Sequence, residues 1–376
     1  MAKDKVVGPE LTAIFELECK SGKSPEMIVI GLMNKYDINI SELQKKMAEK
    51  GLDVSFSKVK YNEIAPFVNL DPADLFDDVP LFDLNRSRIP TSIFRTIVED
   101  MDVLMMQYGP FQEHLNEEAT SRTLAPIFNR LVAVFKSAIK NRPESIITGR
   151  ITTKGRIEYH FKTFGALAIL FVEVKHVIAP NEKLDCIAQV IAECDACDWS
   201  NVGLNMHVPI FGILCDAVGF SFFKFDGSTS PYTFSAGRDP SSESWGYTTL
   251  PLFPAMHNSR LFLTHLRIIS EIVFDILLTA YCQSLVVYRD RSQARPTQRG
   301  PRKSLAEWND AIKYAESAKT KCHDAEAKRK AALLGEANAI VNDAFQDINK
   351  SLELVPQKYK KDKLMNHWDD MEIEMS

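Results

Sequence analysis

The segment GRIEYHFKTFGALAILFVEVK, residues 155–175, decides the fold class of this chain. Its first half, Gly155–Lys162, alternates apolar with polar side chains, which is the two-residue period of a half-buried strand. Its second half, Ala166–Val174, is an almost continuous apolar run, typical of a central strand buried on both faces. A turn is expected at Thr163–Gly165 between them. The segment therefore predicts two neighbouring β-strands.

The sequence on either side of this segment predicts helices and further strands. Thr91–Lys140 has a helical pattern with one apolar face, formed by Leu124, Ile127, Phe128, Leu131 and Phe135. A helix is expected over Asn181–Asp198, two strands over Ile210–Cys215 and Phe220–Phe225, and a long apolar helix over Phe262–Tyr288. The order of these elements indicates an α/β fold with a mixed β-sheet core flanked by helices.

Shifts in composition predict four parts of the chain. An accessory N-terminal region with helical content spans residues 1–95, and the α/β domain spans residues 96–290. A basic linker follows at 291–303, and a charged helical tail occupies 304–376.

Three shorter segments carry local predictions. A helix is expected near Ser41–Lys50, with Ser41 as its N-cap. Leu70–Leu84 contains five aspartates and two prolines, and Ser228–Pro254 is rich in serine, glycine and proline, so both are expected to be loops.

The composition limits the class of protein. The 376 residues are 45% hydrophobic and 25% charged, and the net charge of -5 means that any polyanion site must come from local clusters of basic residues. Seven cysteines without a disulfide framework, and a charged rather than apolar start, predict an intracellular protein, cytoplasmic or nuclear and not secreted. The pair Cys194 and Cys197 lacks a second pair, so buried helical cysteines are favoured over a zinc site.

One apolar stretch is long enough to be compared with a membrane span. Ile268–Tyr288 contains Glu271 and Asp275. A charge at the centre of a bilayer costs ~3 kcal/mol, so this stretch predicts a core helix and no membrane partner.

The chemistry is expected at Glu173-Val174-Lys175, at the end of the buried strand. Alternation places Glu173 and Lys175 on one face of that strand. Glu158 joins the same face if the hairpin pairs it opposite Phe171 or Glu173. Two carboxylates suit Mg²⁺ or Mn²⁺, and a lysine beside them suits contact with a phosphate, so the set predicts phosphodiester hydrolysis. Taken alone, the tripeptide is explained more simply by an ordinary ion pair on a solvated strand.

Two helices supply further polar groups. The helix over Cys186–Cys194 is apolar nearly all round except for Gln189 and Glu193, which lie four residues apart on one face. Such a stripe needs a polar partner in a buried helix, and the alternative is that it faces solvent. Glu117 lies about two turns before Leu124 and therefore points inward, whereas Glu118 points elsewhere. A carboxylate favoured by the helix dipole is an equally good explanation for Glu117.

The combination of Gly155 and Glu158, then Glu173 and Lys175, then the helical Gln189 resembles the RecB-type branch of the PD-(D/E)XK nucleases. The strand pair from Gly212 to Phe225 resembles the corresponding strands of restriction-enzyme subunits. The wider stretch 149–291 looks like that of uncharacterised fungal proteins assigned to this superfamily. The resemblance covers roughly residues 110–290. It departs from the family pattern at Glu158, where aspartate is usual, and at Glu193, which replaces a helical tyrosine.

The resemblance implies a restriction endonuclease-like fold and a role for each matching residue. Glu158 and Glu173 would be metal ligands and Lys175 the catalytic lysine. Gln189 would orient the site, and Glu117 would be an auxiliary acid. The expected activity is that of a Mg²⁺-dependent nuclease, and the alternative is a catalytically inactive nucleic-acid-binding module on the same fold.

DNA or RNA is the expected partner, and two groups of basic residues could contact it. Arg156, His160 and Lys162 alternate onto the Glu158 face, although exposed strand decoration explains each of them singly. Arg295, Arg299, Arg302 and Lys303 belong to a basic strap at 289–303, for which an interdomain linker or a nuclear-import signal is the alternative.

The charged tail offers a third possibility. Over residues 304–352 it carries one apolar stripe, made of Leu334, Ala337, Val341, Phe345 and Ile348. Such a stripe predicts a helical partner or self-association, as in a scaffold or interaction protein.

Overall fold

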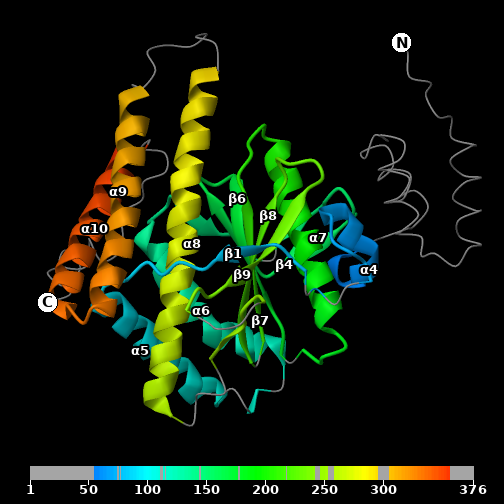
Figure 1. Cartoon of the computed structure of the whole chain (residues 1–376), viewed down its shortest axis with the longest axis horizontal. Helices are drawn as coiled ribbons and strands as arrows, with labels where there is room; N and C mark the ends of the chain where they lie inside the picture. Colours follow the sequence, from blue (N-terminus) through cyan, green and yellow to red (C-terminus); the bar gives the residue numbers. More distant parts are fainter. Residues whose placement is uncertain are drawn as a thin grey trace, which may run out of the picture.

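The computed structural model describes residues 55–355, apart from 74–75, 77, 111–112, 115, 144, 177, 217, 242–245, 253–257 and 295–304. In this part of the chain, a mixed β-sheet lies between helices, which confirms the predicted α/β class (Figure 1). The helix predicted near Ser41–Lys50 lies outside the described residues.

The main sheet has the strand order β1-β9-β8-β7-β6-β5-β2, and β10 pairs with β8. The pairs β1–β9 and β6–β7 are parallel and the other pairs are antiparallel. The strands of this sheet are β1 (Leu81–Asp83), β2 (Ile139–Asn141), β5 (Tyr159–Thr163), β6 (Leu167–Val174), β7 (Ile210–Cys215), β8 (Gly219–Asp226), β9 (Thr233–Arg238) and β10 (Leu250–Pro251). A separate hairpin pairs β3 (Ser145–Ile147) with β4 (Gly155–Ile157).

Helices cover both faces of the sheet (Figure 1). Helix α7 packs on one face, and α6 and α8 pack on the other. The α-helices are α4 (Tyr61–Ile64), α5 (Thr91–Tyr108), α6 (Glu117–Val134), α7 (Lys183–Val202), α8 (Ser259–Ala294), α9 (Leu305–Lys330) and α10 (Leu334–Leu354). Two 3₁₀ turns, η1 (Phe56–Lys58) and η2 (Ala65–Val68), flank α4. No helix in the described ranges combines the length and the apolar character needed to span a bilayer.

The central strand is formed as its sequence predicts. All eight residues of β6 are buried, and β6 pairs with β5 on one side and β7 on the other. The apolar face predicted from Leu124 to Phe135 is fully buried as well. Burial of large apolar side chains on both faces of β6 therefore fixes the middle of the sheet.

The strand predicted over Gly155–Lys162 is wrong as a single element. It divides at Glu158, because β4 pairs with β3 whereas only β5 pairs with β6. Phe56 packs so closely on Gly155 that a Cβ atom there would lie 2.0 Å from its ring. The 3₁₀ turn η1 therefore packs directly on β4, the strand that precedes Glu158.

Both predicted loops contain strands. Leu81–Asp83, within the first, pairs with β9 as an edge strand, and β9 and β10 arise within the second. Phe234 and Leu250 are buried there against the rest of the sheet. Strand β1 is three residues long and takes its partner from a distant part of the chain, so local composition could not reveal it. Strand β9 forms a hairpin with β8 that the serine, glycine and proline content of its segment concealed.

The extended segment that follows β1 runs between α8 and α9. Arg86 Nη2 lies 2.6 Å from Glu271 Oε2, and Arg86 Nη1 lies 3.5 Å from Glu326 Oε1. Arg88 Nη2 donates to Asn338 Oδ1 at 3.1 Å. The segment thus joins the edge of the sheet to α8, α9 and α10.

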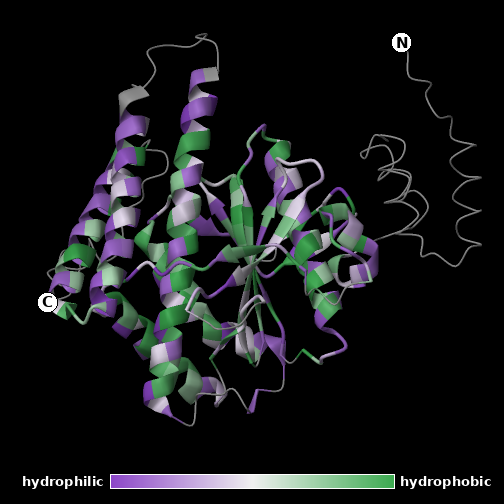
Figure 2. Cartoon of the chain, viewed as in Figure 1, coloured by the Kyte–Doolittle hydropathy of each residue, from purple (hydrophilic) through white to green (hydrophobic). Residues whose placement is uncertain are grey.

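The apolar stripe of the tail is covered by the same chain. Ala337, Val341 and Ile348 are buried, and the Phe345 ring stacks on Phe274 of α8 with 5.3 Å between ring centroids. Figure 2 shows that α9 is hydrophilic along much of its length and that α10 carries both hydrophilic and hydrophobic residues. Among the five residues of the stripe only Leu334 is largely exposed, at 56%, so little of the stripe predicted to bind a helical partner remains at the surface.

The described residues of the predicted N-terminal region, α/β domain and tail contribute to one hydrophobic core. This core extends from Phe56 to Val355 and includes residues of β6, α7 and α8.

Candidate functional site

The candidate site lies at the end of β6. Glu173 is 4% exposed, and Lys175 follows the strand directly. The backbone N–H of Lys175 donates to the Cys215 carbonyl at 2.8 Å, so its side chain keeps the alternation of the strand. Lys175 Nζ consequently lies 2.6 Å from Glu173 Oε1. The ion pair is partly buried, and burial alone would lower the pKa of Lys175. The negative charge and hydrogen bond of Glu173 outweigh burial, so the pKa of Lys175 lies above its ordinary value.

Helix α7 supplies a buried amide above this ion pair. Gln189 Nε2 donates to Glu173 Oε1 at 2.6 Å and to Glu193 Oε1 at 2.9 Å. Gln189 is 9% exposed, and Glu193 is fully buried. The structure therefore brings the polar stripe of α7 onto the carboxylate of the central strand, and Glu193 joins the site beside Gln189.

Glu158 lies between β4 and β5, at the same end of the sheet. Because Tyr159 pairs with Val172, the next position along places Glu158 opposite Glu173. Glu158 Oε2 is buried and has no hydrogen-bond partner among the described residues. Burial, followed by the charges of Glu173 and Glu117, raises the pKa of Glu158 to about 7.

The first turn of α6 adds one more carboxylate. Asn116 caps this helix by accepting a hydrogen bond from the Ala119 N–H at 2.9 Å. Glu117 Oε1 then lies 4.0 Å from Lys175 Nζ, whereas Glu118 Oε1 accepts from Arg122 Nε at 2.7 Å in solvent. Glu117 faces the site and Glu118 faces away from it.

The basic residues predicted on the Glu158 face have different surroundings. His160 is fully buried, with Nε2 3.6 Å from Cys197 Sγ, and burial lowers its pKa to about 3. A neutral, enclosed imidazole fits neither a phosphate contact nor exposed strand decoration. Lys162 is partly buried, and burial lowers its pKa. Arg156 is exposed on β4.

Two other sequence predictions concern cysteines and the basic strap. Cys194 and Cys197 are buried free cysteines, as expected of small apolar residues in a core helix. Four residues of the strap lie outside the described residues, namely Arg295, Arg299, Arg302 and Lys303.

A second polar cluster on α7 was not predicted. Buried Arg150, between β3 and β4, lies 2.6 Å from Asp195 Oδ1 and 2.6 Å from Asp198 Oδ2. Its guanidinium also lies over the rings of Trp199 and Tyr232, 5.1 and 4.7 Å from their centroids. We call these five residues the Arg150 cluster. Two aspartates in a buried helix were a visible signal, but their partner lies 45 positions away in the sequence.

The donor chemistry of the site suits a hard cation. Glu158 and Glu173 present carboxylate oxygens, the ligands that Mg²⁺ and Mn²⁺ prefer, and no described residue forms a hydrogen bond with Glu158 Oε2. Across the described ranges, however, no three His, Cys, Asp or Glu side chains are grouped so that they could hold a metal ion. The residues therefore offer a two-carboxylate set whose Glu173 member is already bonded to Lys175 and Gln189.

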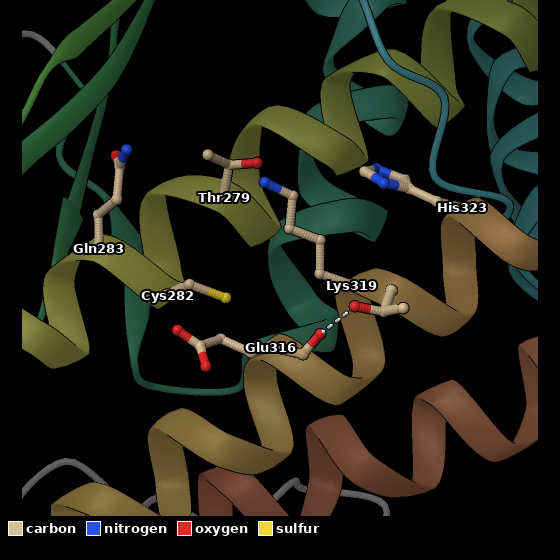
Figure 3. A pocket seen from close by; sticks show the side chains of 7 residues that line it. Thr279, Cys282, Gln283, Glu316, Lys319 and His323 are labelled. Atoms are coloured by element: carbon tan, nitrogen blue, oxygen red, sulfur yellow. Dashed lines mark hydrogen bonds between the residues drawn. The ribbon is translucent and has the colours of Figure 1, made fainter.

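A separate polar groove lies between α8 and α9 (Figure 3). Its volume is about 420 Å³, and it is lined by Thr279, Cys282, Gln283, Glu316, Lys319, Thr320 and His323. His323 Nε2 is bonded to Asp275 Oδ1 at 2.5 Å. None of the residues of the candidate site lines this groove.

In comparisons with known protein families and with curated proteins, no match to this chain is found.

Proposed function

We propose that this protein is a metal-dependent nuclease of the PD-(D/E)XK type, with a restriction endonuclease-like core, that hydrolyses phosphodiester bonds in DNA or RNA. The observation that carries the proposal is the contact between Glu173 and Lys175 at the end of the buried central strand. Two ionic side chains at such a position are costly unless they serve a ligand. The unpaired carboxyl oxygen of Glu158 beside them supports the same interpretation.

Each residue has a role in this proposal. Glu158 and Glu173 would hold Mg²⁺ or Mn²⁺, which when bound neutralises phosphate charge and makes a coordinated water more acidic. Lys175 would donate to a phosphate oxygen or to the attacking water, while Glu173 keeps its ammonium in place. Gln189 fixes the orientation of the Glu173 carboxylate through its 2.6 Å hydrogen bond. Glu117 adds a half-exposed carboxylate that can accept a proton at the rim.

A catalytically inactive nucleic-acid-binding module is the second candidate. It is favoured by the contacts of Glu173 Oε1 with both Lys175 and Gln189, because these side chains pair with the carboxylate in the absence of a metal ion. In addition, the described residues contain no group of three His, Cys, Asp or Glu side chains that could hold a metal ion.

The two candidates are separated by a cleavage assay on the full chain. Single- and double-stranded DNA and RNA are incubated with Mg²⁺, with Mn²⁺ and with a chelator, and Lys175→Ala serves as the control. The nuclease proposal predicts cation-dependent cleavage that is lost in the control. Binding without cleavage under any cation would favour the inactive module, and neither binding nor cleavage would contradict both.

A further inference from the structure

Helix α7 buries three carboxyl groups, and their surroundings differ. Asp195 and Asp198 are each 2.6 Å from the Arg150 guanidinium. Glu193 is fully buried, yet no cationic side chain of the described residues forms an ion pair with it. Its hydrogen bond comes from Gln189 Nε2 at 2.9 Å, and its Oε2 atom receives none from the described residues.

Glu193 is therefore expected to stabilise the fold less than an apolar side chain at the same position would. A buried carboxyl group that lacks a full set of partners is costly, and an apolar side chain of similar length would pack there without that cost. Burial, and next the nearby charge of Glu173, raises the pKa of Glu193 well above the ordinary carboxyl range.

The hydrogen bond from Gln189 to Glu193 restrains the orientation of the Gln189 amide. A glutamine amide nitrogen has two hydrogens, and here one is donated to Glu173 Oε1 and the other to Glu193 Oε1. Two acceptors fix the amide plane and keep Gln189 Oε1 turned away from the Glu173 carboxylate. With a single acceptor, the amide could rotate or flip, and its oxygen would then oppose the carboxylate that it should orient.

We propose that Glu193 is a positioning residue that holds the Gln189 amide in the orientation that sets Glu173. This inference rests on the proposed function for its effect on turnover, but not for the orientation of the amide. Glu193 acts through Gln189 and contacts neither substrate nor cation.

The test uses two substitutions in the full chain. Glu193→Met keeps the length of the side chain and removes the acceptor, whereas Glu193→Gln keeps a carbonyl acceptor for Gln189. Cys197→Ala is the matched control, because Cys197 is equally buried one turn further along α7 and has no contact with the Gln189 amide. Thermal midpoints, kcat and KM for oligonucleotide cleavage, and the side-chain amide proton resonances of Gln189 are measured for each.

A positioning role predicts opposite effects on stability and on turnover. Glu193→Met should match or exceed the wild-type thermal midpoint, while kcat falls about ten- to hundredfold with little change in KM, as for residues that orient a metal ligand. Glu193→Gln should recover most of kcat. The two Gln189 amide protons should exchange slowly in the wild type and quickly in Glu193→Met, and Cys197→Ala should leave both kcat and the amide protons unchanged.

Two results would overturn the inference. One is a lower thermal midpoint in Glu193→Met with kcat reduced only in proportion to the unfolded fraction, which is a purely structural role. The other is unchanged protection of the Gln189 amide protons in that variant. If the wild type cleaves no nucleic acid, the proposed function fails, and the amide protons still decide whether Glu193 positions Gln189.

Discussion

Helix α7 contributes to two buried polar clusters that differ in how completely they are paired. In the Arg150 cluster, one guanidinium bonds two aspartates and stacks on two aromatic rings. In the candidate site, the carboxyl groups of Glu117, Glu158 and Glu173 face the single ammonium of Lys175, and Glu158 Oε2 has no partner among the described residues. A closed cluster serves the fold, whereas an unpaired carboxyl oxygen beside an excess of negative charge leaves room for a cationic ligand.

The largest effect is expected on catalysis in the open cluster. Glu173→Ala and Lys175→Ala should each lower kcat/KM by on the order of 10³-fold, since the first removes a proposed metal ligand and the second removes the charge that acts on the reacting phosphate. Both variants should keep the wild-type circular dichroism spectrum, and Lys175→Ala should have the lower thermal midpoint because it leaves the buried Glu173 carboxylate without its cation. Wild-type turnover in either variant would contradict the assigned roles.

The next largest effect is expected on stability in the closed cluster. Arg150→Met leaves Asp195 and Asp198 buried without their cation, which should lower the free energy of unfolding by roughly 3–5 kcal/mol. Urea denaturation measures this loss. The control is Arg130→Met, which breaks a solvent-exposed pair with Asp100 and should cost no more than ~1 kcal/mol. Equal losses in the two variants would erase the distinction between the clusters.

A smaller effect on turnover separates two neighbouring carboxylates at the rim. Glu117→Gln should lower kcat about tenfold, because Glu117 lies 4.0 Å from Lys175 Nζ. Glu118→Gln should change kcat little, since Glu118 pairs with Arg122 in solvent. Steady-state kinetics of the two variants decide between them, and a larger effect at Glu118 would show that the helical phase was misassigned.

The smallest effect is a pH dependence of stability that Glu158 introduces. Its pKa is about 7 in the folded state, above the ~4.3 of an unfolded glutamate. Between these values the folded state binds more protons than the unfolded state, so the free energy of unfolding falls as the pH rises through this window. Glu158→Gln should therefore match the wild type near pH 5 and have the higher thermal midpoint at pH 8. A variant that is less stable than the wild type at pH 8 would argue against an unpaired Glu158 carboxylate.

The sequence predicted the elements that depend on local pattern. Strand β6 and helix α7 lie where the apolar run and the helical spacing placed them, and the β5–β6 register puts Glu158 opposite Glu173. The candidate site follows from that register and from the polar stripe of α7.

Features that depend on distant partners were not predictable from local pattern. The break at Glu158 arises because β4 pairs with β3, and the edge strand β1 forms only by pairing with β9, which lies far away in the sequence. Arg150 gave no local sign of its two aspartates. His160 was expected at the surface, because the strand alternation could not show that α7 covers that face.

The extended segment that follows β1 and carries Arg86 and Arg88 has a consequence for folding during synthesis. Arg88 donates to a residue 250 positions later in the chain, so this contact must wait until α10 has been made. At about 5–20 residues per second, that delay is on the order of ten seconds or more. Until then the Arg88 guanidinium lacks its Asn338 partner, whereas Arg86 can already pair with Glu271 of α8 and Glu326 of α9. A nascent chain that ends before α10 would therefore expose the apolar side chains of α8 and α9 on which α10 packs, such as Phe274, and these form a surface that chaperones bind and proteases attack.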